Sequence, residues 1–262
     1  MNKANFCLML ILLLSFAVLN AGTMTVSEFE LEVWRLSNIE RERYSLPSLA
    51  YDNGLAELAR LHSRNMLSYG FFAHKDHNGD EVAQRRSKYY PNLLIVSIGE
   101  NLGKFKNSAK IFHPQDLVNG WMQSPRHREN LLNPNYTHLG IGLVFKGETL
   151  YATQVFSTPI AKLLSQLPKK INAKKTYRLS FEYLSKQEAT KLCATLIYPD
   201  KNLSYKVSED KEMVGAQPIP IRWKSSTSFE VDIPFLAGKG NYQLCFGFGG
   251  GYYPEGLILK AK

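Results

Sequence analysis

The chain is poor in cysteine, with three in 262 residues. It also lacks the short patterns that mark common catalytic and metal sites: HExxH, CxxC and GxSxG are all absent. No segment repeats at a fixed period, and no tract is of low complexity. No motif therefore fixes the spacing of a metal site or identifies a serine nucleophile. The composition, with 44% hydrophobic and 12% aromatic residues, is that of a globular protein with a real core.

Long apolar runs are absent except at the N-terminus. Residues 1–21 carry one positive charge at Lys3, an apolar run to Val18 and a small residue at Ala21. This layout predicts a cleaved secretory signal peptide, and therefore a secreted or periplasmic protein. A membrane helix needs about 20 apolar residues, so an uncleaved anchor is the alternative. We expect no transmembrane span in the mature chain.

Removal of the signal peptide leaves two cysteines, Cys193 and Cys245. In an exported protein two such cysteines can form one disulfide. The alternative is a pair of buried thiols on neighbouring strands.

Charge is divided unevenly along the chain. Residues 22–160 carry 15 Lys and Arg against 14 Asp and Glu, whereas residues 161–262 carry 16 against 9. A basic second half in an exported protein suggests contact with an anionic wall polymer, lipid headgroups or glycan. The alternative is a set of lysine-rich solvated faces. We expect no nucleic-acid partner.

Helices are expected first along the chain. Ser27 and Glu30 form a capping-box pattern before one helix, and Asp52 and Gly70 are placed to begin and end a second. A third is predicted over residues 113–123 and a hairpin over 139–156. Beyond a basic connector, residues 161–175, the alternating segments 177–184, 191–198, 228–235 and 241–248 predict a small β-sandwich. We therefore divide the chain into a signal peptide (1–21), a first domain (25–160), the connector (161–175) and a β-sandwich-like domain (176–262).

Histidines and one carboxylate stand at structural junctions of the first half. His62 shares the apolar face of the second predicted helix, where a core residue is the simpler interpretation than a ligand. His74 follows two aromatic residues at a loop start, and Glu100 follows the apolar run LLIVSI. A carboxylate in that position needs a partner, and a histidine is a natural one. Two histidines and a carboxylate are also a minimal set for a divalent metal.

The stretch SPRHRENLLNPNY predicts a short helix that places His127 beside the same region. Ser124 suits its N-cap and Pro125 its first turn, but capping gives no reason for His127. The nearby DHNGDE segment, residues 76–81, is better explained as a turn than as a calcium loop, because its glycine comes fourth and not sixth.

These segments together resemble a known family. LSNIERERYSLPSLAYDNGLAELARLHSRNMLSYGFFAH, GENLG, GWMQSPRHRENLLNPNYTHLGIGLVF and YATQVF follow the order of the CAP superfamily (cysteine-rich secretory proteins, antigen 5 and pathogenesis-related-1 proteins), in its cysteine-poor, bacterial-type branch. The resemblance covers residues 25–157 and implies an α-β-α sandwich with a cleft there; it says nothing about residues 161–262. In animal and plant members, two histidines and two glutamates line this cleft and can hold a metal.

His74 and Glu100 match the first histidine and the GEN glutamate of that tetrad. Tyr151 and Ser124 fall at the other two positions, and His127 is expected to supply the missing imidazole. The implied cleft therefore contains His74, Glu100 and His127, with Tyr151 and His62 as neighbours. His74 and His127 are the candidate ligands for Zn²⁺ or another divalent cation.

Three functions remain open from the sequence. The favoured hypothesis is a binding protein whose cleft captures a small amphiphile or glycan while the basic β-domain docks on an anionic surface. The first alternative is a metal-dependent, peptidase-like hydrolase with Glu100 as general base. Its weakness is that Glu100 cannot serve as both metal ligand and base. The second alternative is a structural or adhesion protein with an idle cleft.

Overall fold

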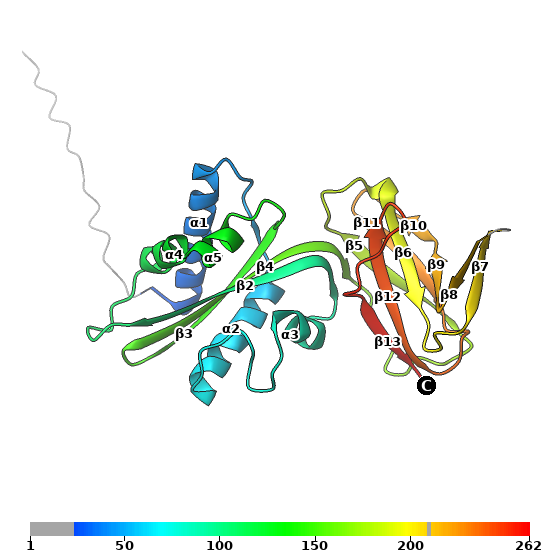
Figure 1. Cartoon of the computed structure of the whole chain (residues 1–262), viewed down its shortest axis with the longest axis horizontal. Coiled ribbons are helices and arrows are strands. Elements are labelled where there is room, and N and C mark those ends of the chain that lie inside the picture. Colours follow the sequence, from blue (N-terminus) through cyan, green and yellow to red (C-terminus); the bar gives the residue numbers. More distant parts are fainter. Residues whose placement is uncertain (1–23, 209–210) are drawn as a thin grey trace, which may run out of the picture.

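The computed structural model describes residues 24–208 and 211–262. The predicted signal peptide lies outside these residues. The described chain forms two halves, one of helices packed on a sheet and one built of strands (Figure 1). The fold class is α+β, as the sequence predicts. None of the described helices is long and apolar enough to cross a membrane.

Helices cover both faces of the sheet in the first half (Figure 1). α1 and α4 pack together on one face, with α5 beside them, and α2 contacts β3 and β4 from the other. The described helices are α1 (Val26–Arg43), α2 (Asn53–Tyr69), α3 (Val82–Tyr89), α4 (Pro114–Gln123) and α5 (Pro125–Leu131), with a 3-10 turn at Ala189–Lys191. This is the α-β-α layering expected from the sequence.

The first-half strands are β1 (Ala50–Tyr51), β2 (Leu93–Lys106), β3 (His138–Lys146) and β4 (Thr149–Leu163). β4 lies between β2 and β3 and is antiparallel to both. The second-half strands are β5 (Thr176–Tyr183), β6 (Leu192–Ile197), β7 (Ser204–Ser208), β8 (Lys211–Val214), β9 (Ala216–Ile219), β10 (Ile221–Trp223), β11 (Ser228–Pro234), β12 (Gly240–Phe248) and β13 (Leu257–Ala261).

The second half is a sandwich of two sheets. β5, β11 and β10 form one layer, and β13, β12, β6 and β9 form the other. Phe181 and Phe229 stack with ring centroids 5.4 Å apart, and Phe246 from the opposite sheet meets both edge-on. β5, β6, β11 and β12 coincide with the four segments predicted from alternation.

Strand β4 joins the two halves. Its last residues, Ala161 to Leu163, pair with β5, so one sheet continues from the first half into the second. The start of the predicted connector therefore lies inside a strand. A second link is the ion pair between buried Arg86 on α3 and Glu255, 2.8 Å long. The halves share both a sheet and a side-chain contact.

The helix caps show how local the sequence signals are. α2 begins at Asp52, whose side chain accepts the Leu55 N–H, and ends at Gly70 in the left-handed conformation, as predicted. The N-cap of α1 is instead Thr25, two residues before the predicted N-cap, Ser27. Thr25 and Glu28 form the box, and Ser27 lies within the helix. Both residue pairs satisfy the same Ser/Thr-x-x-Glu pattern, so the pattern alone could not choose between them.

Close packing of α2 on β3 depends on two glycines. Gly140 and Gly142 lie on the β3 face beneath α2, where added Cβ atoms would meet backbone atoms of residues 55–56 and 59–60 respectively. The intervening residue, Ile141, points to the opposite face and joins the core under α1. Glycine therefore sets the distance between helix and sheet.

The two cysteines lie on neighbouring strands. Cys193 on β6 faces Gly247, and Cys245 on β12 faces Thr195, so the cysteines lie on the same face of the sheet but are offset by two residues. Both are free thiols in this structure, and Cys245 is buried. Burial raises the pKa of the Cys245 thiol to about 11. Only Cys245 is buried, whereas Cys193 is partly exposed, so the pair matches the second alternative in its strands but not fully in its burial, and the disulfide stays a prediction.

Candidate functional site

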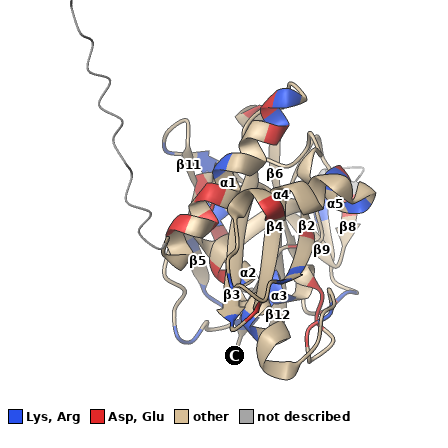
Figure 2. Cartoon of the chain, turned by 90° about the vertical axis from the view of Figure 1, so that its left-hand side faces the viewer, with Lys and Arg blue, Asp and Glu red and all other residues tan. Residues whose placement is uncertain are grey.

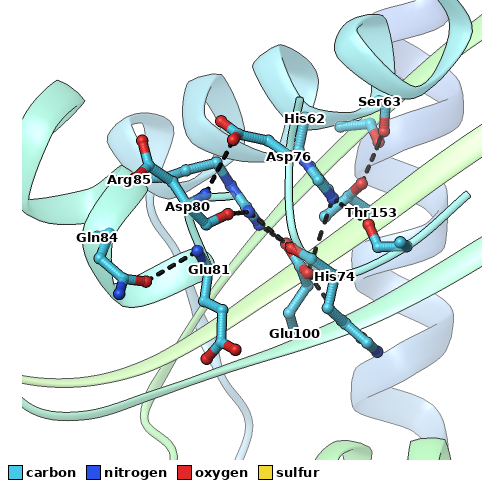
Figure 3. Close-up of polar contacts among 12 residues, drawn as sticks. His62, Ser63, His74, Asp76, Asp80, Glu81, Gln84, Arg85, Glu100 and Thr153 are labelled. Atoms are coloured by element: carbon cyan, nitrogen blue, oxygen red, sulfur yellow. Dashed lines mark hydrogen bonds and ion pairs between the residues drawn. The ribbon is translucent and has the colours of Figure 1, made fainter. Parts of the chain in front are cut away.

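A buried carboxylate organises the site. Glu100 lies within β2, where only 2% of its side chain is exposed. One carboxylate oxygen accepts a hydrogen bond from His74 Nδ1 at 2.9 Å, and the other pairs with Arg85 (Figure 3). The side chain of Arg85 is fully buried. Glu100 is thus held between an imidazole and a guanidinium.

His74 lies in the loop after α2, and 58% of its side chain is exposed. A carboxylate only accepts hydrogen bonds, so Nδ1 carries the proton and Nε2 is directed away from Glu100. The hydrogen bond that His74 donates to Glu100 raises the pKa of His74 above its ordinary value, and burial opposes that rise. The result is an oriented, solvent-accessible imidazole.

Arg85 is the site residue that the sequence did not reveal. It comes from α3, a helix that was not predicted, and its Nη1 also donates to the backbone oxygens of His74 (2.7 Å) and Asp80 (2.6 Å). Arg85 therefore fixes both the carboxylate and the loop that carries His74. The sequence indicated only that a buried Glu100 needs a partner, because burying an unpaired carboxylate is costly; it did not identify Arg85 as that partner.

His127 reaches the same region from α5 and is half-buried. The Asn101 side chain donates to the His127 carbonyl at 2.9 Å, and Asn130 donates to the Glu100 carbonyl at 3.2 Å. These bonds attach α5 to β2 beside Glu100. Burial lowers the pKa of His127, and the charge of nearby His74 lowers it further. Ser124 is the N-cap of α5 as predicted, although its side chain makes no capping hydrogen bond.

The two expected neighbours have different positions. His62 is fully buried; its Nε2 donates to the Ala73 carbonyl at 3.0 Å and lies 3.9 Å from Glu100. Burial lowers the pKa of His62, and its Nδ1 has no hydrogen-bond partner. Tyr151 is also buried, and its ring packs near exposed Phe72 and beneath the Lys104 ammonium. His62 thus holds the loop that carries His74 through the Ala73 carbonyl, and the Tyr151 ring lies beside Phe72 of the same loop.

The donor set is a poor fit for a resident divalent cation. Both Glu100 oxygens are engaged, one by His74 and one by Arg85. The Arg85 guanidinium would also repel a cation bound at that carboxylate. Within residues 24–208 and 211–262, no three His, Cys, Asp or Glu side chains are grouped to share a metal ion. The metal at His74 and His127 stays a prediction from the resemblance.

A cavity of about 510 Å³ lies elsewhere, at the junction of the two halves. Its lining includes Ser97, Asn135, Thr158 and Tyr253, and it does not include His74 or Glu100. It contains no pair of titratable groups comparable to His74 and Glu100. We therefore place the candidate site at the accessible imidazole and not in this cavity.

The Glu100 contact makes a direct prediction about His74. Glu100→Gln removes the negative charge that favours the imidazolium, so the pKa of His74 should fall. A titration of the imidazole Cε1–H resonances by NMR measures this shift. His138, whose pKa is lowered by burial on β3, is the internal control and should not move. An unchanged His74 titration in folded Glu100→Gln would show that the contact is absent in solution.

Comparison with known proteins assigns the first half to a family. Residues 34–157 match the sequence model of the CAP, cysteine-rich secretory protein family. The chain contains a CAP domain. It is 32% identical over 123 residues to the uncharacterized protein YkwD of Bacillus subtilis, covering 47% of this chain and 45% of YkwD. It is 31% identical over 127 residues to the uncharacterized membrane protein YlbC of the same organism, covering 48% of this chain and 34% of YlbC.

A solved structure is also similar, that of an extracellular protein containing an SCP domain from Bacillus anthracis. The TM-score is 0.43 at 28% identity, with 52% of this chain and 45% of that one covered. The chain thus spans less than half the length of the curated relatives it matches. The CAP domain contains His74, Glu100 and His127, and it ends before the all-β half begins.

Proposed function

We propose that this is an exported CAP-domain protein that binds a small amphiphile or glycan at the face around His74, while its basic all-β half attaches to an anionic surface. The observation that carries the proposal is the buried Arg85–Glu100 pair, which directs the accessible imidazole of His74. Burying a charged pair is expensive, and an apolar pair of similar volume is often at least as stable. Its most economical explanation is that it holds His74 in place for a ligand.

The surroundings of His74 suit a ligand with polar and apolar parts. Phe72 is 46% exposed, the Tyr151 ring lies beside it, and the Lys104 ammonium lies over the Tyr151 ring. An aromatic surface next to an imidazole and an ammonium can contact the apolar face of a sugar or an acyl chain. The polar groups can bind its hydroxyl or acidic groups. Both Glu100 oxygens are already engaged by His74 and Arg85, so neither is free to accept a proton from a water molecule, which weighs against the hydrolase.

Native mass spectrometry of the exported chain, purified without chelator, tests ligand capture. A retained small-molecule mass is expected, and His74→Ala should reduce its occupancy about tenfold or more, as loss of a hydrogen bond to a charged group implies. His113→Ala, which removes an exposed histidine at the start of α4, is the matched control and should retain the ligand.

Other masses would overturn the proposal. A bare polypeptide from every preparation, or equal retention in His74→Ala, would leave no role for this site in binding. A stoichiometric metal adduct lost in His74→Ala would favour the metal-dependent hydrolase instead.

A further inference from the structure

One end of the β-sandwich gathers lysines from four segments. Residues 168–176 lie against β13, where the Lys262 N–H donates to the Ile171 carbonyl at 2.9 Å. The same segment meets residues 234–241, since the Lys174 N–H donates to the Phe235 carbonyl at 2.7 Å. The turn at 198–203 adjoins Gly240, whose neighbour is Pro199. We call residues 168–176, 198–203, 234–241 and 258–262 the basic end; the chain terminus marks it in Figure 1.

The basic end carries eight lysines and one acidic side chain, Asp200. All eight lysines are exposed: Lys169, Lys170, Lys174, Lys175, Lys201, Lys239, Lys260 and Lys262. Asp200 accepts the Asn202 N–H within its own turn. The carboxylate of Asp232, on the adjoining strand β11, is held by Arg178 and Arg222. Because Asp232 is already paired with two arginines and Asp200 is the one acidic side chain within the basic end, the eight lysines leave a large excess of positive charge there.

The same end exposes apolar side chains. Leu236 is 67% exposed, and Leu203 and Tyr205 are each 37% exposed. These three line a cavity of about 280 Å³ together with Pro234 and Ala237. A lysine-rich face alone could simply be solvated. Exposing a leucine and an apolar cavity to water is unfavourable, and such an apolar patch marks an interaction surface. Lysines around exposed apolar residues are the pattern of a surface that lies in a membrane interface.

We propose that the basic end docks on a lipid bilayer containing anionic lipids, with its lysines against the headgroups and Leu236 at the boundary with the acyl chains. This assignment deepens the attachment part of the proposed function and names its chemistry. An anionic polymer would be attracted by the same lysines, but it would gain little from Leu236. Leu236 therefore distinguishes a bilayer from a polymer.

Co-sedimentation with vesicles tests the proposal. The exported chain is mixed with vesicles of phosphatidylcholine alone or with one quarter phosphatidylglycerol. Every variant keeps the same N-terminus, so the contribution of the N-terminal segment to vesicle binding is the same in all of them. Binding is expected only with the anionic vesicles, and it should weaken with added salt. Each lysine near such a surface contributes about fivefold in partitioning, so replacing Lys169, Lys170, Lys239 and Lys260 with Gln should reduce binding about 600-fold.

A matched variant removes the same charge elsewhere. Lys186, Lys191, Lys206 and Lys224 are exposed residues of the second half outside the basic end; their replacement with Gln should reduce binding far less. Leu236→Ser should reduce vesicle binding about fivefold while leaving retention on a polyphosphate column unchanged.

Equal losses from the two four-lysine variants would overturn the proposal. So would a chain that binds polyphosphate but not anionic vesicles, which would identify an anionic polymer as the partner. Ligand retention at His74 is read separately by mass spectrometry. Failure of docking and failure of ligand capture are therefore distinguishable.

Discussion

Arg85→Leu should lower the free energy of unfolding by about 3–5 kcal/mol, because it leaves the Glu100 carboxylate buried without its cation. Both side chains are almost completely removed from water. The substitution also removes the two bonds to backbone oxygens that hold the His74 loop. Urea denaturation followed by tryptophan fluorescence measures the loss.

Arg35→Leu is the matched control. Arg35 pairs with Glu32 on the exposed side of α1, a helix that carries both acidic and basic residues (Figure 2), and solvent screening makes such a pair contribute little to stability. The double variant Arg85→Leu, Glu100→Leu should recover much of the loss, because it leaves no buried charge unpaired. If Arg85→Leu is no more destabilising than Arg35→Leu, Glu100 is not held as the structure indicates.

Gly142→Ala should destabilise the protein by about 3 kcal/mol or more. The added methyl group would meet backbone atoms of Ala59 and Arg60, and a backbone cannot rotate aside as a side chain can. Either α2 moves away from β3, opening the core beneath Leu55 and Leu58, or the strand distorts. Thermal and urea unfolding both report the change.

Gly251→Ala is the control for this substitution. Gly251 has no positive φ, and the nearest atom to an added Cβ is the Phe248 carbonyl oxygen at 3.8 Å. We expect a change within about 0.5 kcal/mol there. Equal stability of Gly142→Ala and Gly251→Ala would contradict the close approach of α2 to β3.

The sequence was informative wherever a structural feature depends on nearby residues. Asp52 and Gly70 define the ends of α2 through bonds within one or two turns, so their residue types predict them. The sandwich strands were predictable because β5, β6, β11 and β12 alternate between core and surface. Helix α3 was not, because its buried residues are Arg85 and Arg86 and not an apolar stripe. Hydrophobic periodicity does not detect a helix that packs through arginines.

The candidate site was predictable in part for the same reason. His74 and Glu100 were paired correctly because a buried carboxylate needs a partner, and the 2.9 Å contact agrees with that inference. The Arg85 partner depends on how α3 packs against β2, which no local pattern encodes. The continuation of β4 into β5 is likewise carried by three residue pairs between strands of different halves. Such long-range pairings escape a reading based on neighbouring residues.

The shared strand has a mechanical consequence. β4 runs without interruption from the CAP domain into the sandwich, and the Arg86–Glu255 ion pair connects the halves at a second point. We therefore expect the two halves to move as one rigid unit and not as domains joined by a flexible linker. A load applied at one end is transmitted along hydrogen-bonded backbone. Anchorage at the basic end would therefore hold the His74 imidazole at a fixed height and tilt above the anchoring surface, so the distance that the site can reach would be set by the fold.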